Sequence, residues 1–275
     1  MTMFGACARA QTVTTDVPTP SEPRPPLWEA GVAVGGGRVS DYPGSNQSHL
    51  RAIALPMLIY RGPILRIENG GIGSRFVHTP TWDFELTGTA AFNARNDDAR
   101  AGMPGLDYLF GIGPQWVYKG WLTPAGGPSL HLKWHALMST NFKRIDQRGY
   151  SISPELRWHF ADVGRIASAP VALTLSVQPT WASAPLQRYF YEVKPSEATP
   201  TRAAYAVRAG YLGTDLGASI DHRLARNLSW FAGAQIMSLR GTANEASPLM
   251  RSRLNVNVGA GLVWTPWRSD ATAPD

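Results

Sequence analysis

Apolar and polar side chains alternate along the segment from Ser129 to Ser139. The apolar positions are Leu130, Leu132, Trp134, Ala136 and Met138. His131, Lys133 and His135 lie between them. Successive side chains of a β-strand point to opposite faces, so the segment predicts a strand with one apolar face and one charged face. In a soluble sandwich the polar face is outside, whereas in a membrane barrel the apolar face meets lipid and the polar face lines the lumen.

The same alternation recurs along much of the chain. It is visible in the segments 82–93, 155–160, 171–178, 228–236 and 254–264. Several runs reach about ten residues, which exceeds the usual globular strand and matches the roughly 9–11 residues that a tilted strand needs to cross a bilayer. Aromatic residues near the ends of many runs fit the interfacial girdles of a membrane barrel. A large secreted β-sandwich or a lipocalin-like barrel is the alternative.

Composition favours a barrel over transmembrane helices. The chain has 275 residues, of which 44% are hydrophobic, and its mean hydropathy is −0.18. It contains no apolar run long enough for a membrane-spanning helix, and no segment of useful length has helical periodicity. A membrane protein of such mild hydropathy must close into a barrel, because closure satisfies every backbone group in lipid.

The fold prediction is therefore all-β, a single antiparallel up-and-down transmembrane β-barrel of about 12 strands, with 10 or 14 as alternatives. The predicted strands are 27–37, 50–60, 63–68, 71–78, 82–93, 106–119, 130–142, 150–160, 170–182, 212–224, 228–240 and 252–266. The even number puts both ends of the barrel on the periplasmic side. Segments 38–49, 94–105, 143–149, 183–211 and 241–251 then become extracellular loops, and 120–129 and 161–169 become the longest periplasmic turns.

The two ends of the chain are predicted to lie outside the barrel, which spans 27–267. Residues 1–10 include Ala8-Arg9-Ala10, which resembles a signal cleavage site, so this segment is interpreted as a residual or truncated signal. Residues 11–26 are rich in Pro and Thr and predict a flexible leader. Residues 268–275 form a C-terminal tail. Cys7 is the only cysteine, so an intramolecular disulfide is impossible.

Charged and polar residues on the inward faces are the candidate functional residues. We expect the lumen to be lined by Asp83, Glu85, His131, Lys133, His135, Glu155, Arg157, His159, Asn255 and Asn257. The charged members are expected to pair across strands and fill the barrel rather than select a solute. With about twelve strands, the interior should lie between filled eight-strand barrels and open sixteen-strand porins.

The sequence predicts no catalytic, metal or cofactor site. His135 and Ser139 share a face but are roughly 13 Å apart along a strand, too far for a nucleophile and its base. Glu155 or His159 on the next strand could lie closer to these histidines. No cysteine cluster or His-Glu motif predicts metal ligands. We therefore expect a protein that is not an enzyme.

One loop motif and the charge balance bear on partners. The motif Asp41-Tyr42-Pro43-Gly44 predicts mainly a turn; a role in binding is the alternative. The formal net charge is +6 and arginine outnumbers lysine, which would suit the phosphates of lipopolysaccharide; codon bias is the simpler explanation. The basic residues are scattered, so nucleic-acid binding is not expected.

Several segments together resemble the MipA/OmpV family of outer-membrane proteins. They are Trp28–Val34 with Ser40–Asn46, Leu55–Gly62, Tyr189–Ala198 with Ala204-Tyr205 and Gly210-Tyr211, and Ala246–Met250. Two departures from the family pattern are expected: residues 1–10 do not form its usual complete signal peptide, and a tail follows Trp267, where the family usually ends on an aromatic residue.

The resemblance implies a barrel in the bacterial outer membrane, in contact with its lipid and lipopolysaccharide. It also implies a scaffold that joins a lytic transglycosylase to a murein synthase. A narrow channel or an entry route for solutes or antibiotics is the alternative function, and an enzyme acting on lipid is a third.

Overall fold

The computed structural model describes residues 26–61, 66–67, 74–167 and 169–272. The predicted signal segment 1–10, nearly all of the predicted leader 11–26 and the connection between the predicted strands 63–68 and 71–78 lie outside the described residues. The last three residues of the predicted tail, 273–275, also lie outside them.

The described residues are mainly β-strands. In chain order these are β1 (Trp28–Ser40), β2 (Ser48–Arg61), β3 (Arg66–Ile67), β4 (Ser74–His78), β5 (Trp82–Ala91), β6 (Tyr108–Tyr118), β7 (Gly126–Thr140), β8 (Ile145–Phe160), β9 (Arg165–Ile166), β10 (Ala169–Ala182), β11 (Gly210–Ala225), β12 (Leu228–Ser238) and β13 (Leu254–Arg268). One α-helix, α1 (Ala184–Tyr191), and two short 3-10 helices, η1 (Asp98–Arg100) and η2 (Pro195–Glu197), lie in the loops.

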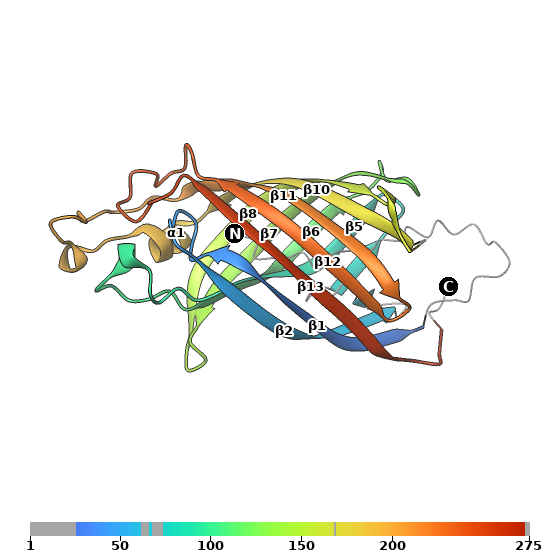
Figure 1. The fold of residues 1–275 in the computed structure, drawn as a ribbon. Coiled ribbons are helices and arrows are strands. Elements are labelled where there is room, and N and C mark those ends of the chain that lie inside the picture. The colour runs from blue at the N-terminus through green and yellow to red at the C-terminus, as the bar shows by residue number, and fades with distance from the viewer. Residues whose placement is uncertain (1–25, 62–65, 68–73, 168, 273–275) are drawn as a thin grey trace.

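The sheet closes on itself to form a barrel (Figure 1). Within the described residues it contains 13 strands, all joined in antiparallel pairs. β9 forms only a small hairpin with β10, so β8 pairs directly with β10. The other twelve strands pair in chain order, and β13 returns to pair with β1. The predicted all-β up-and-down barrel of about 12 strands is confirmed.

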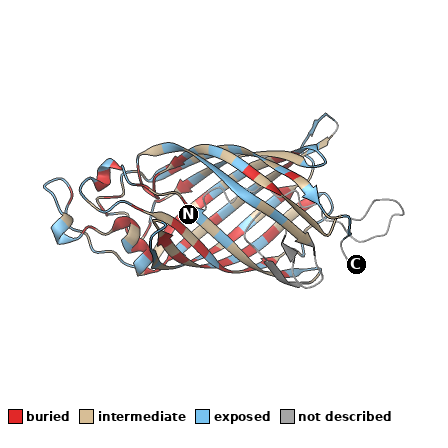
Figure 2. Ribbon diagram, turned by 90° about the horizontal axis from the view of Figure 1, so that it is seen from below, coloured by how far each residue is buried: buried red, intermediate tan, exposed pale blue. Residues whose placement is uncertain are grey.

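The two faces of the barrel differ as the alternation predicts (Figure 2). On β7, Trp134 is 40% exposed whereas the neighbouring Lys133 is 7% exposed. The same contrast holds on β13, where Leu254 and Val256 point outward and Asn255 is buried. The outer surface is therefore an apolar belt suited to lipid, and the polar side chains are enclosed.

Aromatic pairs mark both edges of this belt. At one end the rings of Trp82 and Tyr118 are 4.7 Å apart, and Trp264 and Trp267 lie on the same rim at the end of β13. At the other end Trp181 pairs with Tyr211, with ring centroids 5.7 Å apart. Two such girdles are what the two membrane–water interfaces favour.

The ends of the barrel differ in the length of their connections. The start of β1 and the end of β13 lie at one end, together with the short turns 79–81, 119–125 and 226–227 (Figure 1). The loops 41–47, 92–107, 183–209 and 239–253 lie at the opposite end. Short turns are periplasmic and long loops extracellular in barrels of this type. The orientation agrees with the sequence prediction.

Two local features differ from the sequence-based expectation. β8 begins at Ile145 rather than at residue 150, and β7 ends at Thr140 rather than at residue 142, so the expected loop 143–149 becomes the shorter loop 141–144. Helix α1 was not expected, because eight residues are too few for a periodic signal. Tertiary packing of its buried Leu186 and Phe190 stabilises it instead. Neither α1 nor any other helix among the described residues has the length and apolar character to cross a membrane.

The outward face of β7 provides a test of the membrane placement. We expect Leu132→Arg to lower the free energy of unfolding by about 2–4 kcal/mol, because it places a charge against lipid in the middle of a strand. The control Leu254→Arg, at the rim, should cost roughly 0–1 kcal/mol. Equilibrium unfolding in lipid vesicles measures both. Equal costs for the two variants would contradict the placement.

Candidate functional site

A buried ion-pair network lies on the inner wall of the barrel, on the neighbouring strands β7, β8 and β10. Lys133 Nζ lies 2.7 Å from Glu155 Oε2 and donates to Gln178 Oε1 at 2.7 Å. Arg157 contacts the same carboxylate at 2.9 Å. Lys133 and Glu155 are almost fully buried. Charges buried this deeply need partners, and the network supplies them from three neighbouring strands.

Other residues that were predicted to line the lumen also contact a partner side chain. Lys119 Nζ contacts Asp83 Oδ1 at 2.8 Å, and Gln115 donates to Glu85 at 2.9 Å. His159 lies 3.2 Å from the hydroxyl of Thr174 on β10. Neither Lys119 nor Gln115 was among the predicted residues, although each contacts a predicted carboxylate: Gln115 lies on β6, and Lys119 directly follows that strand.

The histidines of β7 have different partners from those considered in the sequence. His131 Nε2 lies 2.9 Å from Ser129 Oγ. Ser139 instead accepts a hydrogen bond from Arg148 at 2.7 Å. Ser129 was missed because it fell within the predicted turn 120–129. The carboxylate of Glu155, opposite His131 in the strand register, contacts Lys133 and Arg157.

A small cavity lies beneath α1. Its volume is about 30 Å³, and it is lined by Lys133, His135 and Gln178 and by Leu186 and Phe190 of α1. That volume holds about two water molecules. Among the described residues, no group of three or more His, Cys, Asp or Glu side chains is placed to hold a metal ion.

The predicted motif Asp41-Tyr42-Pro43-Gly44 folds inward over the mouth, where two predicted lumen residues hold it. Asn255 accepts from Gly44 N at 2.6 Å and donates to Ser45 O at 2.7 Å. Asn257 accepts from Ser40 N at 2.8 Å. Gly44 has a φ of +93°, and a Cβ there would lie 2.2 Å from Met250 Sδ. The positive φ strains any other residue at this position.

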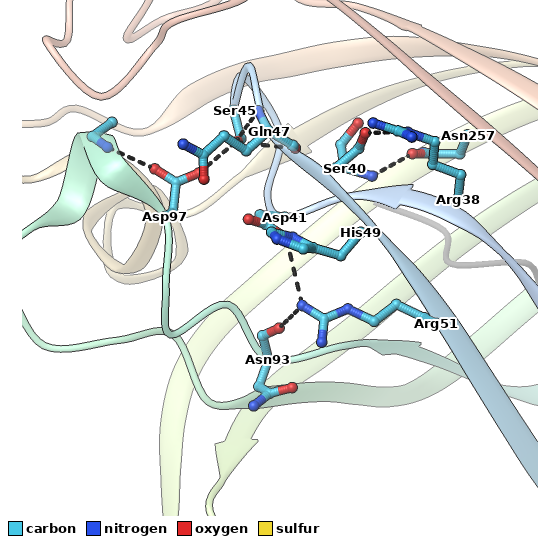
Figure 3. Close-up of polar contacts among 12 residues, drawn as sticks. Arg38, Ser40, Asp41, Ser45, Gln47, His49, Arg51, Asn93, Asp97 and Asn257 are labelled. Atoms are coloured by element: carbon cyan, nitrogen blue, oxygen red, sulfur yellow. Dashed lines mark hydrogen bonds and ion pairs between the residues drawn. The ribbon is translucent and has the colours of Figure 1, made fainter.

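Asp41 fixes the base of the motif (Figure 3). Its buried carboxylate lies 2.7 Å from His49 Nδ1 and 3.5 Å from Arg51. Arg51 also donates to the carbonyl oxygen of Asn93 at 3.1 Å, which brings in the loop 92–107. The motif therefore acts as a structural junction between extracellular loops.

We use the term cap for the extracellular loops 41–47, 92–107, 183–209 and 239–253, which interlock over the mouth. Tyr191 of α1 donates to Pro43 O at 2.8 Å, and Tyr42 donates to Leu249 O at 2.8 Å. Arg100 donates to Phe190 O at 3.0 Å. These groups surround an apolar cluster that includes Leu106 and Leu239.

Burial changes the acidity of the cap's polar groups. It raises the pKa of Tyr42 and of Tyr191 well above the ordinary phenol value. Burial also lowers the pKa of Arg100, whose guanidinium lies 5.9 Å from the centre of the Tyr42 ring. All three shifts have desolvation as their main cause, which indicates that water is excluded from the cap.

A closed barrel with an apolar belt, two aromatic girdles and long loops at one end defines a bacterial outer-membrane β-barrel protein. A family model described as "MltA-interacting protein MipA" matches residues 32–266. The chain belongs to the MipA family, and the resemblance seen in the sequence is confirmed. No curated protein sequence matches the chain significantly.

Solved barrels show a distant likeness. The COG4313 outer membrane channel from Pseudomonas putida F1 is 12% identical, with a TM-score of 0.48; the match covers 90% of this chain and 98% of that one. A FadL homologue of Pseudomonas aeruginosa is 9% identical, with a TM-score of 0.30 and coverage of 86% and 90%. The toluene transporter TbuX of Ralstonia pickettii is 10% identical, with a TM-score of 0.29 and coverage of 90% and 71%.

Tyr189 gives a pH test of the cap. Burial raises its pKa to about 12 from the ordinary 10.0, and its hydroxyl donates to Asp107 O at 2.7 Å. The folded state holds this proton more tightly than the unfolded state does. Its contribution to stability is therefore complete below pH 10.0 and is lost as the pH rises through about 12.

We expect the difference in tyrosinate absorbance between the wild type and Tyr189→Phe to show one phenol titrating near pH 12. The free energy of unfolding of the wild type should fall over the same alkaline range. A difference curve centred at pH 10.0 would contradict the burial of this hydroxyl.

Proposed function

We propose that this outer-membrane barrel is a non-conducting scaffold that binds murein-cleaving and murein-synthesising enzymes at its periplasmic end. The observation that carries the proposal is the closed lumen. The cap covers the extracellular mouth, and the buried Lys133–Glu155–Arg157 network lines the bore beneath it. A barrel whose mouth is covered is better suited to binding partners than to passing solutes.

The closed lumen also weighs against the alternative of a narrow channel or solute-entry route. The cavity of about 30 Å³ is far smaller than a typical ligand pocket of roughly 300–1,000 Å³. A solute would have to displace α1, whose buried side chains Leu186 and Phe190 form the roof. Passage would require the cap to rearrange.

The partner proposal draws on the family and on the periplasmic turns. The family description names an interaction with MltA, which we take as a lytic transglycosylase; a murein synthase is the second proposed partner. Trp121 in the turn 119–125 and Val163 and Ile166 in the β8–β10 connection are about half exposed. Exposed aromatic and aliphatic side chains of this kind are suitable anchors for a protein partner.

The proposal includes the absence of catalysis. The contact between Ser129 and His131 is buried inside the barrel, out of reach of a lipid or murein substrate. The carboxylate of Glu155 is held by two cations, so it is poorly placed to orient His131 as the third member of a catalytic triad.

Conductance tests the closed lumen. The wild-type barrel in a planar bilayer should give no conductance steps. The variant Lys133→Ala/Glu155→Ala should stay closed because the cap remains, and adding Arg100→Ala/Tyr191→Ala should open the bore. Steps from the wild type would instead favour the channel function.

A binding assay tests the scaffold role. The full barrel in micelles should retain a purified lytic transglycosylase and a bifunctional murein synthase. Trp121→Ser/Val163→Ser/Ile166→Ser should weaken retention by roughly 30-fold in Kd, the effect of losing an interface anchor worth about 2 kcal/mol. Phe142→Ser, which removes an exposed aromatic at the opposite end, is the matched control. Retention of neither enzyme would reject the proposal.

A further inference from the structure

The connection between β7 and β8 differs from every loop of the cap. We call its residues 141–145 the β7–β8 tip. The loops of the cap extend along the barrel axis beyond the mouth, whereas this hairpin stands out sideways at the extracellular rim (Figure 1). A segment in that position lies over the outer leaflet of the membrane rather than over the lumen.

The tip has a fixed shape. Asn141 Oδ1 accepts hydrogen bonds from the backbone N–H groups of Lys143 and Arg144, at 3.0 and 3.1 Å. Thr140 Oγ1 accepts from Phe142 N at 2.9 Å and donates to Arg144 O at 2.9 Å. Phe142 is held at a φ of +66°, a left-handed conformation that is costly for a bulky side chain. Such strain is a pointer to function.

The strained turn presents apolar side chains outward. Phe142 is 82% exposed and Ile145 is 66% exposed. The ring of Phe142 lies 5.2 Å from that of Tyr108, so it continues the aromatic girdle beyond the barrel wall. In water this exposure would be unfavourable, but at the membrane surface the same side chains reach the acyl chains.

Positive charge lies between the two apolar side chains. Asp146 pairs with Arg144 at 3.2 Å and with Arg148 at 3.0 Å. Arg148 is further occupied by Ser139 and by the ring of Tyr189. Lys143 has no carboxylate partner within 4.0 Å among the residues that the structure describes. The tip therefore carries excess positive charge at its outermost point.

We propose that the β7–β8 tip is an interfacial anchor for the phosphate-bearing surface of the outer leaflet. Phe142 and Ile145 enter the acyl region, while Lys143 and Arg144 contact lipid phosphates above it. Long cationic side chains beside apolar ones are suited to this boundary, since the stem lies in the apolar layer and the charge stays with the headgroups. The inference rests on the membrane placement and is independent of the scaffold role.

A depth measurement tests the anchor in the full chain. Ile145→Cys in a Cys7→Ser background would carry an environment-sensitive fluorophore, and the barrel would be reconstituted in vesicles with brominated acyl chains. We expect the fluorophore to be quenched. Quenching should be stronger in phosphatidylglycerol than in phosphatidylcholine, because each cation at an anionic surface adds about 5-fold to partitioning. Arg240→Cys, in the cap, is the control position and should be unquenched.

Charge removal separates the two parts of the anchor. In Lys143→Gln/Arg144→Gln, the preference for phosphatidylglycerol should disappear. Absence of quenching at position 145 would overturn the proposal, as it would place the tip in water. Equal quenching in both lipids for the wild type would overturn the attraction of Lys143 and Arg144 to anionic headgroups, because the phosphate of phosphatidylcholine is balanced by that lipid's own cation. None of these variants should change retention of the murein enzymes, so the two proposals fail separately.

Discussion

The pairing of β13 with β1 is the constraint on which the rest of the structure depends. In lipid an unpaired backbone amide has no water to bind, so the sheet must close. Glycines make this closure tight. A Cβ at Gly31 would lie 1.9 Å from Trp264 O, and one at Gly37 would lie 2.1 Å from Val258 O. Without this pairing, β1 and β13 would leave their backbone groups open along two exposed edges.

Closure of the sheet also determines how the side chains inside the barrel are arranged. Once the apolar side chains face lipid, the alternating polar ones are confined to a narrow bore, where an unpaired charge is costly. Lys133, Glu155 and Arg157 meet this requirement together, and Asn255 meets it by holding the backbone of the loop 41–47. Enclosed polar groups need hydrogen-bond or ion-pair partners. This requirement explains both the paired side chains in the lumen and the contacts that hold the cap in place.

The barrel was predictable from the sequence because a period of two is a local property. Each strand carries its own signal, as on β7, where Lys133 is buried between the exposed Leu132 and Trp134. The cap was not predictable. Its contacts join residues far apart in the chain, and the motif around Gly44 looks like an ordinary turn. Ser129, the partner of His131, was missed for another reason. It lies near the end of β7, where the alternation of apolar and polar residues no longer shows whether a residue belongs to the strand or to the turn.

The hold of Asn255 on the first extracellular loop has a consequence for the order of assembly. Gly44 and Asn255 are 211 residues apart in the chain, and Ser40 and Asn257 are 217 apart. Contacts of such long range form late in folding. The first loop therefore lacks the hydrogen bonds with Asn255 and Asn257 until the last strand is in place. A chain truncated before β13 would lose the closure of the barrel and also the hydrogen bonds of Asn255 and Asn257 to the first loop. The complete set of contacts in the cap therefore forms only after the last strand is inserted.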